Sequence, residues 1–279
     1  MSAAAFGLAG VMGWPVAHSR SPKLHNYWIA QHGLQGAYVP LPVAPGQLAA
    51  AVAGLAVLGF RGCNVTLPHK VEAMGLVHEV DATARRMGAL NTIVVQADGS
   101  LKGFNNDGFG YIQSLRDADP QWRADAGPIT VLGAGGAARA VVTSLAEAGA
   151  TEIRLLNRTM GKAMALADAC GAVVKVSPWE DRADALQDIA LLVNTTSQGM
   201  QGNPPLDLDL GRMPGRTLVS DVIYVPMETP LLAAARARGN RTVNGLGMLL
   251  NQARPAFHAW FGVMPEITPE LRRMMAATL

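Results

Sequence analysis

Three polar strings before residue 110 combine side chains that can bind a polyol and move a proton. They are residues 13–22 (GWPVAHSRSP), 64–70 (NVTLPHK) and 103–107 (GFNND). Each follows an apolar run, where a strand should end and a loop begin, and such loops usually carry binding and catalytic groups. Lys70 and Asp107 could act together in acid–base chemistry, because a lysine held beside a carboxylate can stabilise developing negative charge and supply a proton. Taken by itself, Lys70 would be an ordinary exposed lysine at a helix start.

A glycine-rich turn farther along the chain predicts a dinucleotide site. Gly133 allows a tight turn, Gly135 lets the backbone approach a pyrophosphate, and the small Ala138 allows the helix to pack on the strand. The turn opens a helix, whose N-terminal N–H groups would face the phosphates. Glycine-rich turns also occur for structural reasons alone. Cofactor binding is favoured here because an expected strand precedes the turn and an expected helix follows it.

The next expected strand ends in Asn157-Arg158-Thr159, which indicates the type of cofactor. NAD sites usually carry an acidic residue here to bind the ribose 2′-hydroxyl. Arg158, Thr159 and Lys162 would instead form a site for a 2′-phosphate, because guanidinium groups pair well with phosphate oxygens. The sequence therefore predicts NADP(H), and the alternative is a solvated basic turn.

The elements expected to position these groups alternate between strands and helices, which predicts an α/β fold. Serine at N-cap and proline at the first helical position make Ser21-Pro22 a helix start. Residues 118–128, with two prolines and scattered charges, are expected to form a linker edge. Strands are expected at 6–12, 37–43, 60–66, 92–96, 129–132, 152–156, 172–176, 189–193, 218–222 and 241–243. Helices are expected at 21–31, 47–58, 81–87 and 107–115, and another is expected to open within 133–138 and run to 148.

Composition indicates one or two globular domains, since 49% of the 279 residues are hydrophobic. A net charge of +2 argues against nucleic acid and anionic membranes as partners. No apolar run approaches the ~20 residues of a membrane span, and the N-terminus lacks the features of a secretory signal. Cys63 and Cys170 are expected to be buried reduced thiols, and His18 and His25 to be structural hydrogen-bonding residues. We therefore expect a soluble cytoplasmic protein without a metal site.

Nine strings, in order along nearly the whole chain, resemble the shikimate dehydrogenase family. They are residues 13–26, 64–70, 88–92, 103–108, 133–140, 157–159, 194–200, 221–232 and 245–253. The resemblance implies a substrate domain of residues 1–112 with 246–279, and a Rossmann-type doubly wound NADP domain of residues 113–245. The C-terminal helices would pack back on the first domain. The implied reaction is the reversible NADP-dependent reduction of 3-dehydroshikimate to shikimate, in aromatic amino-acid and chorismate biosynthesis.

The resemblance also implies roles for individual residues. Ser19 and Ser21 would bind the substrate carboxylate, with Tyr224 near it, although Ser21 could serve only as a helix cap. Ring hydroxyls would be bound by Thr66, Asn91, Asp107 and Gln252, although Asn91 could be a turn former. Lys70 and Asp107 would form the catalytic pair, which also contacts substrate. NADP(H) would be bound by Gly133, Ala134, Gly135, Gly136, Ala137, Asn157, Arg158, Thr159, Lys162, Thr195, Ile223, Gly245 and Met248.

Two residues depart from the family pattern. Asn106 stands where the family usually has threonine, and Lys162 stands where a second arginine often appears. We expect the chemistry to survive the first change, and the second to weaken the NADP preference modestly. The alternatives are a quinate/shikimate dehydrogenase that uses NAD, a paralogue acting on an aminoshikimate, and a non-catalytic NADP-binding module. The protein is expected to be a monomer or a homodimer.

Overall fold

The computed structural model describes residues 6–279, which divide into two compact units. The first unit contains residues up to Asn106 together with Gln252–Thr278, and the second contains Asp107–Asn251. Residues 1–5, on which the expectation about a secretory signal partly rests, lie outside the described residues. No helix within residues 6–279 is long and apolar enough to span a membrane.

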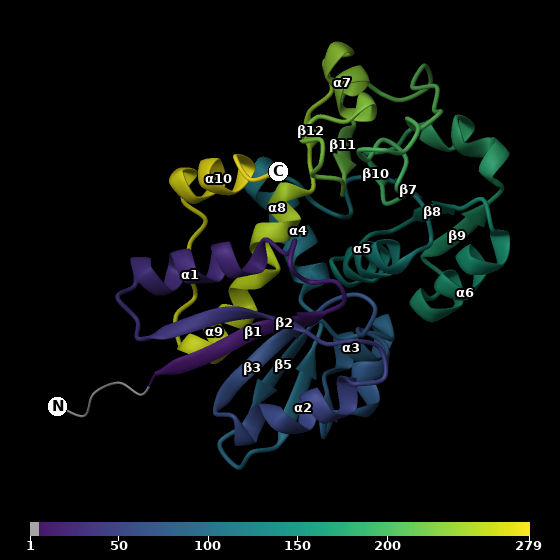
Figure 1. The fold of residues 1–279 in the computed structure, drawn as a ribbon. Helices are drawn as coiled ribbons and strands as arrows, with labels where there is room; N and C mark the ends of the chain where they lie inside the picture. The colour runs from purple at the N-terminus through teal and green to yellow at the C-terminus, as the bar shows by residue number, and fades with distance from the viewer. Residues whose placement is uncertain (1–5) are drawn as a thin grey trace. The chain divides into compact units, whose positions relative to one another are not determined.

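The first unit is built on a six-stranded mixed sheet, ordered β2-β1-β3-β5-β6-β4 (Figure 1). Strands β1, β2 and β3 run parallel, β5 runs antiparallel to both β3 and β6, and β4 is parallel to β6. Because β5 is reversed, its first residue lies at the sheet edge where β3 and β6 end. The strands are β1 (Gly7–Gly13), β2 (Gly36–Pro42), β3 (Phe60–Val65), β4 (Glu79–Val80), β5 (Thr92–Val95) and β6 (Leu101–Phe104).

Helices cover both faces of this sheet, as its buried residues require. One face packs an aliphatic core against α2 (Leu48–Val57), η1 (Glu72–Gly75) and α3 (Ala82–Met87). On the other, α9 (Ala253–Phe261) contacts β1, β3 and β5, while α1 (Ser21–Gln31) contacts β2, α9 and α10 (Pro269–Ala276). The C-terminal helices α9 and α10 thus pack on the first unit, as expected.

Several helices begin or end at a capping residue. The Asp81 side chain accepts a hydrogen bond from the Ala84 N–H at 2.8 Å, and Gly88 ends α3 with a φ of 63°. Thr229 and Thr268 likewise cap α7 (Pro230–Ala237) and α10, each directly before a proline.

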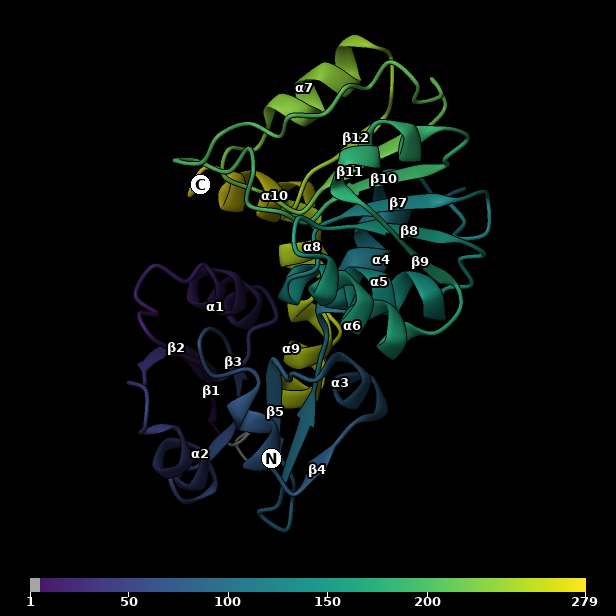
Figure 2. The same ribbon diagram turned by 90° about the vertical axis from the view of Figure 1, so that its right-hand side faces the viewer.

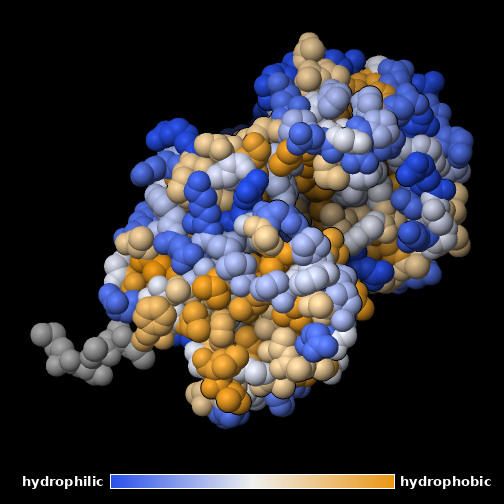
Figure 3. All heavy atoms as spheres, viewed as in Figure 1, coloured by the Kyte–Doolittle hydropathy of each residue, from blue (hydrophilic) through white to orange (hydrophobic). Residues whose placement is uncertain are grey.

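Helix α2 has apolar residues on its exposed side as well as its buried one. Its outer positions are Ala49, Ala50, Ala53 and Val57, and Val57 is 88% exposed. Figure 3 shows hydrophobic residues gathered on the face of the first unit that carries this helix. Apolar atoms contribute more than half of the accessible surface of an ordinary folded protein, so this exposed face does not by itself indicate a partner.

The second unit is a doubly wound sheet of six parallel strands, ordered β12-β11-β10-β7-β8-β9. Read from β9, this is the strand order 3-2-1-4-5-6 of the Rossmann fold. Ligands bind such sheets at the carboxyl ends of the strands, where the order reverses, which here lies between β7 and β10. The strands are β7 (Ile129–Leu132), β8 (Ile153–Leu156), β9 (Val174–Ser177), β10 (Leu191–Asn194), β11 (Leu218–Asp221) and β12 (Thr242–Val243).

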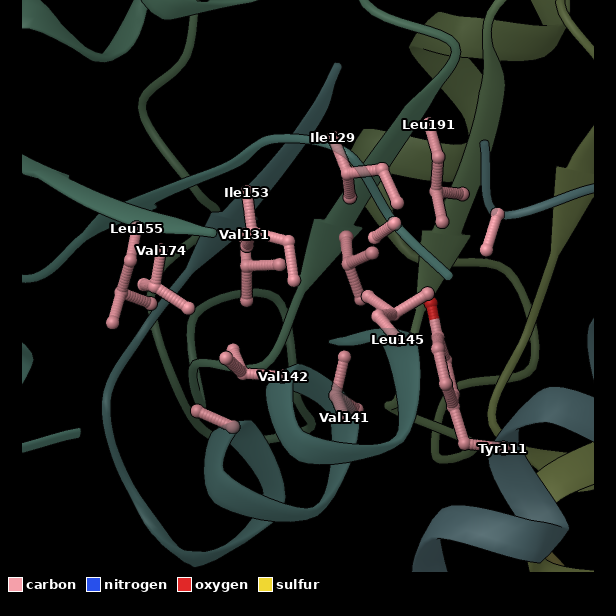
Figure 4. Packing of buried hydrophobic residues seen from close by; sticks show 14 of the residues in the cluster. Tyr111, Ile129, Val131, Val141, Val142, Leu145, Ile153, Leu155, Val174 and Leu191 are labelled. Carbon is pink, nitrogen blue, oxygen red and sulfur yellow. The ribbon is translucent and has the colours of Figure 1, made fainter. Parts of the chain in front are cut away.

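Alternate residues of these strands feed two cores. Val131 and Leu155 belong to the core formed with α4 (Asp107–Ala118), α5 (Gly136–Glu147) and α6 (Met160–Cys170). Figure 2 shows these helices on one face of the sheet, and Figure 4 shows the packed side chains. Their neighbours Leu132 and Leu156 pack on the opposite face. That second core also includes residues of α7 and η3 (Asp184–Leu186), beside η2 (Trp179–Arg182).

The boundaries between the units differ from the expected ones. Helix α4 belongs to the second unit, so residues 118–128 join two elements of that unit instead of linking the two. Helix α8 (Leu246–Asn251) packs closely on α4. Glycine at position 247 permits this approach, since a Cβ there would lie only 2.9 Å from the Ser114 Cβ. The Asn251 side chain also donates to Asp117 Oδ2 at 2.8 Å. The first unit therefore resumes at Gln252 and not at residue 246.

Candidate active site

One edge of the first sheet collects five of the expected substrate residues. Strands β1 and β3 end together, since Met12 is in register with Val65, and Thr92 at the start of β5 pairs with both Asn64 and Phe104. Four chain segments therefore meet at this edge: those after β1, β3 and β6, and the one before β5. They carry Ser19, Ser21, Thr66, Lys70 and Asn91.

Ser19 and Ser21 lie where β1 gives way to α1, both half-buried. The expectation that Ser21 is the N-cap is wrong, because Arg20 holds that position with helical φ and ψ and Ser21 is the first helical residue. The Ser19 hydroxyl instead accepts from the Ser21 backbone N–H at 3.3 Å. The two hydroxyls are thus held two residues apart at a helix N-terminus, which favours an anion.

The segment from Thr66 to Lys70 is fixed by its backbone and by a buried histidine. The Thr66 N–H donates to the Met12 carbonyl at 2.8 Å, and the His69 N–H donates to the Thr66 carbonyl at 3.0 Å. The His69 ring, 1% exposed, places Nε2 2.7 Å from the Val43 carbonyl. The Lys70 carbonyl accepts from the Leu90 N–H at 2.9 Å, so Lys70 lies beside the segment that carries Asn91.

Asp107 and Gln252 flank the two points where the chain passes between the units. Asp107 is the first residue of α4, where its carboxylate is favoured by the helix dipole, and it directly follows Asn106 of the first unit. Gln252 directly precedes α9, the helix that packs on the first sheet. Both side chains are half-buried.

The second unit carries a turn whose shape fits a pyrophosphate. Gly133 follows β7 with a φ of 107°, and a Cβ there would lie 2.6 Å from Thr195 Oγ1. In contrast, a Cβ on Gly135 or Gly136 would meet no atom of the described residues within 4 Å, so open space lies over both. Helix α5 begins at Gly136 and directs its free N–H groups toward that space. The glycine turn thus has the room and the donors that a dinucleotide requires.

A basic segment stands next to this turn at the end of β8. Asn157 joins the two, accepting from the Ala134 N–H at 3.2 Å and donating to the Thr159 carbonyl at 2.9 Å. Arg158, Thr159 and Lys162 are exposed, and neither basic side chain forms an ion pair with a carboxylate within residues 6–279. This donor set suits a phosphate and offers no acid to a ribose 2′-hydroxyl.

The remaining cofactor candidates lie near the carboxyl ends of β10, β11 and β12. The Thr195 hydroxyl donates to the Leu132 carbonyl at 2.7 Å, which ties β10 to the glycine turn. Gly245 packs so closely that a Cβ would lie 2.0 Å from the Val222 carbonyl oxygen. Ile223 is buried and Met248 on α8 is half-buried against the core. Tyr224 lies in this unit too, lining a pocket of about 560 Å³ with residues that include 199–203.

A buried carboxylate that sequence reasoning missed organises this edge. Asp221, fully buried, accepts from Asn194 Nδ2 at 3.1 Å and from the Thr229 hydroxyl at 2.7 Å. Burial raises the pKa of Asp221, while these donors and the Ile223 N–H act in the opposite direction. The loop after β11 and the start of α7 are thereby tied to β10. The sequence signal was an aspartate at the end of an apolar strand, a position that usually means function or a satisfied buried charge.

The histidines and cysteines have no ligand-binding arrangement within residues 6–279, where no group of three or more His, Cys, Asp or Glu could hold a metal. His25 is structural, but the expectation that it forms hydrogen bonds is wrong. Both of its ring nitrogens lack a partner in the described part of the chain, and the ring stacks on Tyr38 at 4.1 Å. His18 is exposed. Cys63 and Cys170 are both free thiols, but only Cys63 is buried as expected; Cys170 is half-buried.

The Rossmann strand order, the glycine turn and the phosphate-type donor set define an oxidoreductase that uses a nicotinamide dinucleotide. Comparisons with known proteins narrow the class. A model of the shikimate dehydrogenase substrate binding domain matches residues 11–93, and a model of shikimate / quinate 5-dehydrogenase matches residues 121–201. The shikimate dehydrogenase (NADP(+)) of Rhodospirillum rubrum is 56% identical over 269 residues, covering 95% of each chain.

Two solved structures extend the comparison. Shikimate 5-dehydrogenase from Thermus thermophilus, in complex with NADP(H) and shikimate, has a TM-score of 0.85 at 35% identity and covers 98% of this chain and 100% of its own. Quinate dehydrogenase from Corynebacterium glutamicum, in complex with NAD, has a TM-score of 0.89 at 30% identity and covers 98% of both chains. This chain belongs to the shikimate dehydrogenase family. The predictions of family, of α/β fold class, of oxidoreductase activity and of NADP(H) as cofactor are confirmed.

Proposed function

We propose that this chain catalyses the reversible, NADP-dependent reduction of 3-dehydroshikimate to shikimate. The observation that supports it best is the convergence of two hydroxyls, a threonine, a lysine and an amide at one edge of the first sheet. A small ring bearing a carboxylate and several hydroxyls needs this set of donors and acceptors. Each well-made hydrogen bond to a hydroxyl also rejects analogues that lack it.

Ser19 and Ser21 bind the substrate carboxylate in this proposal. Their hydroxyls lie at the N-terminus of α1, where the backbone N–H groups and the helix dipole favour a negative charge. Thr66, Asn91, Asp107 and Gln252 bind the ring hydroxyls, and Tyr224 lies near the carboxylate. These assignments follow from the matching positions of the family.

Lys70 and Asp107 carry the proton chemistry in this proposal. The Lys70 ammonium stabilises the charge that develops on the C3 oxygen and supplies the proton that completes the alcohol. The Asp107 carboxylate orients that ammonium and accepts a hydrogen bond from a ring hydroxyl. Bound NADPH supplies the hydride for this reduction.

The second unit holds NADP(H) through the glycine turn and the basic segment. Residues 133–137 take the pyrophosphate, while Arg158, Thr159 and Lys162 take the 2′-phosphate, with Asn157 holding the two segments together. Thr195, Ile223, Gly245 and Met248 line the nicotinamide end. Arg158 can pair with phosphate oxygens through two parallel N–H groups, which makes it the main determinant of NADP over NAD.

The test crosses shikimate and quinate with NADP and NAD and records formation of the reduced cofactor. The proposal predicts a high kcat/KM only for shikimate with NADP. Activity with quinate, or equal use of NAD, would place the chain with proteins such as the quinate dehydrogenase noted above. Inactivity in all four combinations, in a protein that still binds NADPH, would support a non-catalytic NADP-binding module.

The oligomeric state and the cellular location stay predictions. We propose a monomer or a homodimer in the cytoplasm, where its cofactor and substrate would be available. Light scattering of the purified protein and fractionation of cells that express it test these two points.

A further inference from the structure

We propose that Thr92 and Asn106 are positioning residues that hold the Asn91 side-chain amide in one orientation, with its NH₂ group facing the substrate. The proposal deepens the function given above and rests on it, because it takes Asn91 to bind a ring hydroxyl that does not react. All residues concerned belong to the first unit. Neither positioning residue is among those assigned to substrate or cofactor.

The orientation of the Asn91 amide follows from a donor that cannot act as an acceptor. The Asn106 backbone N–H lies 3.0 Å from one end of this amide, and the Thr92 hydroxyl lies 2.9 Å from the same atom. A backbone N–H can only donate, so the atom that it faces must be the carbonyl oxygen. Since an amide has its oxygen and nitrogen on opposite sides, the Asn91 NH₂ group is directed away from Thr92 and Asn106.

The Thr92 hydroxyl has all of its hydrogen-bonding capacity assigned. It donates to Asn91 Oδ1 and accepts from Asn64 Nδ2 at 3.1 Å and from Asn106 Nδ2 at 3.0 Å. A hydroxyl has one proton and two lone pairs, so these three bonds leave no alternative arrangement of equal quality. With both lone pairs occupied, the proton must point at Asn91. Thr92 is 1% exposed, so water does not compete for these bonds.

Asn64 connects the network to the buried core of the first unit. Asn64, 6% exposed, donates from Nδ2 to the Asn91 backbone carbonyl at 3.0 Å and accepts from the Tyr38 hydroxyl at 2.7 Å. The Asn91 carbonyl can only accept, which fixes the orientation of Asn64 as well. The Tyr38 ring is stacked on His25 and buried, so it does not turn away.

Asn106 is the member of the network at the position where the family resemblance leads us to expect a threonine. A threonine hydroxyl at this position could either donate a hydrogen bond to Thr92 or accept one from it. The asparagine places an amide nitrogen toward Thr92, and this group only donates. The substitution therefore favours the arrangement in which Thr92 donates to Asn91.

The consequence is selectivity for a hydroxyl that accepts a hydrogen bond from Asn91. If the Asn91 amide could rotate, its oxygen could face the substrate, and the donor that the bound hydroxyl needs would be lost. A buried group left without its partner is what makes a site reject the wrong ligand.

The test compares Thr92→Val, which keeps the shape and removes the hydroxyl, with Thr92→Ser, which keeps the hydroxyl. We expect Thr92→Val to raise the KM for shikimate about tenfold, with less change in kcat and none in the KM for NADP. Thr92→Ser should restore the wild-type KM. Asn106→Ala, at a half-buried position outside the sheet, should raise the same KM by a smaller factor.

Shikimate analogues that lack the C4 or the C5 hydroxyl separate positioning from general damage. The loss of kcat/KM caused by Thr92→Val should disappear with one of the two analogues and persist with the other. Equal losses with shikimate and both analogues, or an unchanged KM in both Thr92→Val and Asn106→Ala, would overturn the proposal. Wild-type protein that does not oxidise shikimate would refute the proposed function instead, so the two failures are distinguishable.

Discussion

At the scale of single residues, Arg158 carries the choice between the two nicotinamide cofactors. Its side chain is exposed at the end of β8. A charge-assisted hydrogen bond contributes about 1.5–3 kcal/mol. Arg158→Ala should therefore raise the KM for NADP roughly 10- to 100-fold while changing the KM for NAD little. Initial rates at saturating shikimate, with each cofactor varied in turn, measure the two values.

Arg216→Ala is the matched control for this substitution. Arg216 is also exposed, but it lies two residues before β11 and so near the amino edge of the same sheet, away from the glycine turn. Its removal should leave both KM values unchanged. Equal losses for NADP and NAD in Arg158→Ala would contradict the assignment of Arg158 to a 2′-phosphate.

Residue types were readable from the sequence, but their hydrogen-bond partners were not. The polar strings placed Thr66 and Lys70, and the family resemblance placed Asn91, in the segments that the structure brings to one edge. However, the Ser21 cap prediction failed because Ser19, two residues earlier, supplies the acceptor. The prediction for His25 failed because rings from α1, β2 and α9 surround it and provide no acceptor. The Ser21 outcome is decided by local backbone geometry, and the His25 outcome by tertiary contacts that no local pattern encodes.

At the scale of elements, the turn between β7 and α5 depends on a backbone conformation that only glycine adopts readily. Gly133 has a φ of 107°, and a Cβ there would press on Thr195 Oγ1 at 2.6 Å. Gly133→Ala should destabilise the second unit by about 2 kcal/mol or more and abolish NADPH binding. Chemical denaturation and a fluorescence titration with NADPH measure the two effects.

Gly135→Ala is the informative counterpart, since a Cβ there meets only open space. This variant should keep wild-type stability while binding NADPH more weakly, because the methyl group occupies the path of the pyrophosphate. The account of the turn would fail if Gly135→Ala bound NADPH normally, or if Gly133→Ala were as stable as the wild type.

Most elements were predictable because hydrophobic period and turn residues mark them. The helix at 21–31 and the strand at 129–132 have the expected bounds, and other expected elements differ by a few residues at their ends. The two-residue β4 and the glycine-containing β6 were missed, because neither is long or apolar enough to show a period. The reversed direction of β5 was also not evident, although it is what brings Asn91 to the same edge as Thr66.

At the scale of the whole molecule, one buried ring makes stability depend on pH. Burial lowers the pKa of His25 from 6.5 to about 3, so the folded state stays unprotonated while the unfolded state gains a proton below pH 6.5. Stability is therefore full above that value and decreases as the pH falls. The expected loss is about 1.4 kcal/mol per pH unit, or roughly 2–3 kcal/mol on reaching about pH 4.5.

His25→Phe keeps a flat ring on Tyr38 and removes the titrating group, so its stability should vary less over this range. Chemical denaturation can be followed by the fluorescence of Trp28 and Trp260, whose ring centroids each lie 5.6 Å from that of His25. Protonation of Asp221, whose pKa is raised, acts in the opposite direction and is common to both proteins. Identical pH profiles for the two proteins would contradict the role given to His25.

The division of the chain was predictable in outline and not in its boundaries. The family resemblance anticipated that the C-terminal segment returns to the first unit. The point of return moved because Gly247 and Ser114 allow α8 to approach α4 closely, a contact between segments far apart in the sequence. The assignment of substrate to the first unit and of NADP to the second stays a prediction.

The most direct test of the account is turnover by the wild-type protein beside Lys70→Ala, with shikimate and NADP both saturating. We predict NADPH formation by the wild type, and at least about a 100-fold lower kcat in Lys70→Ala with an unchanged Kd for NADPH. Lys102→Ala is the control, because the half-buried Lys102 forms an ion pair with exposed Glu79 at 2.7 Å and lies 5.5 Å from the centre of the Phe104 ring, and it has no role in the proposed site. A wild-type protein that forms no NADPH, or a Lys70→Ala variant with near-normal turnover, would contradict the account.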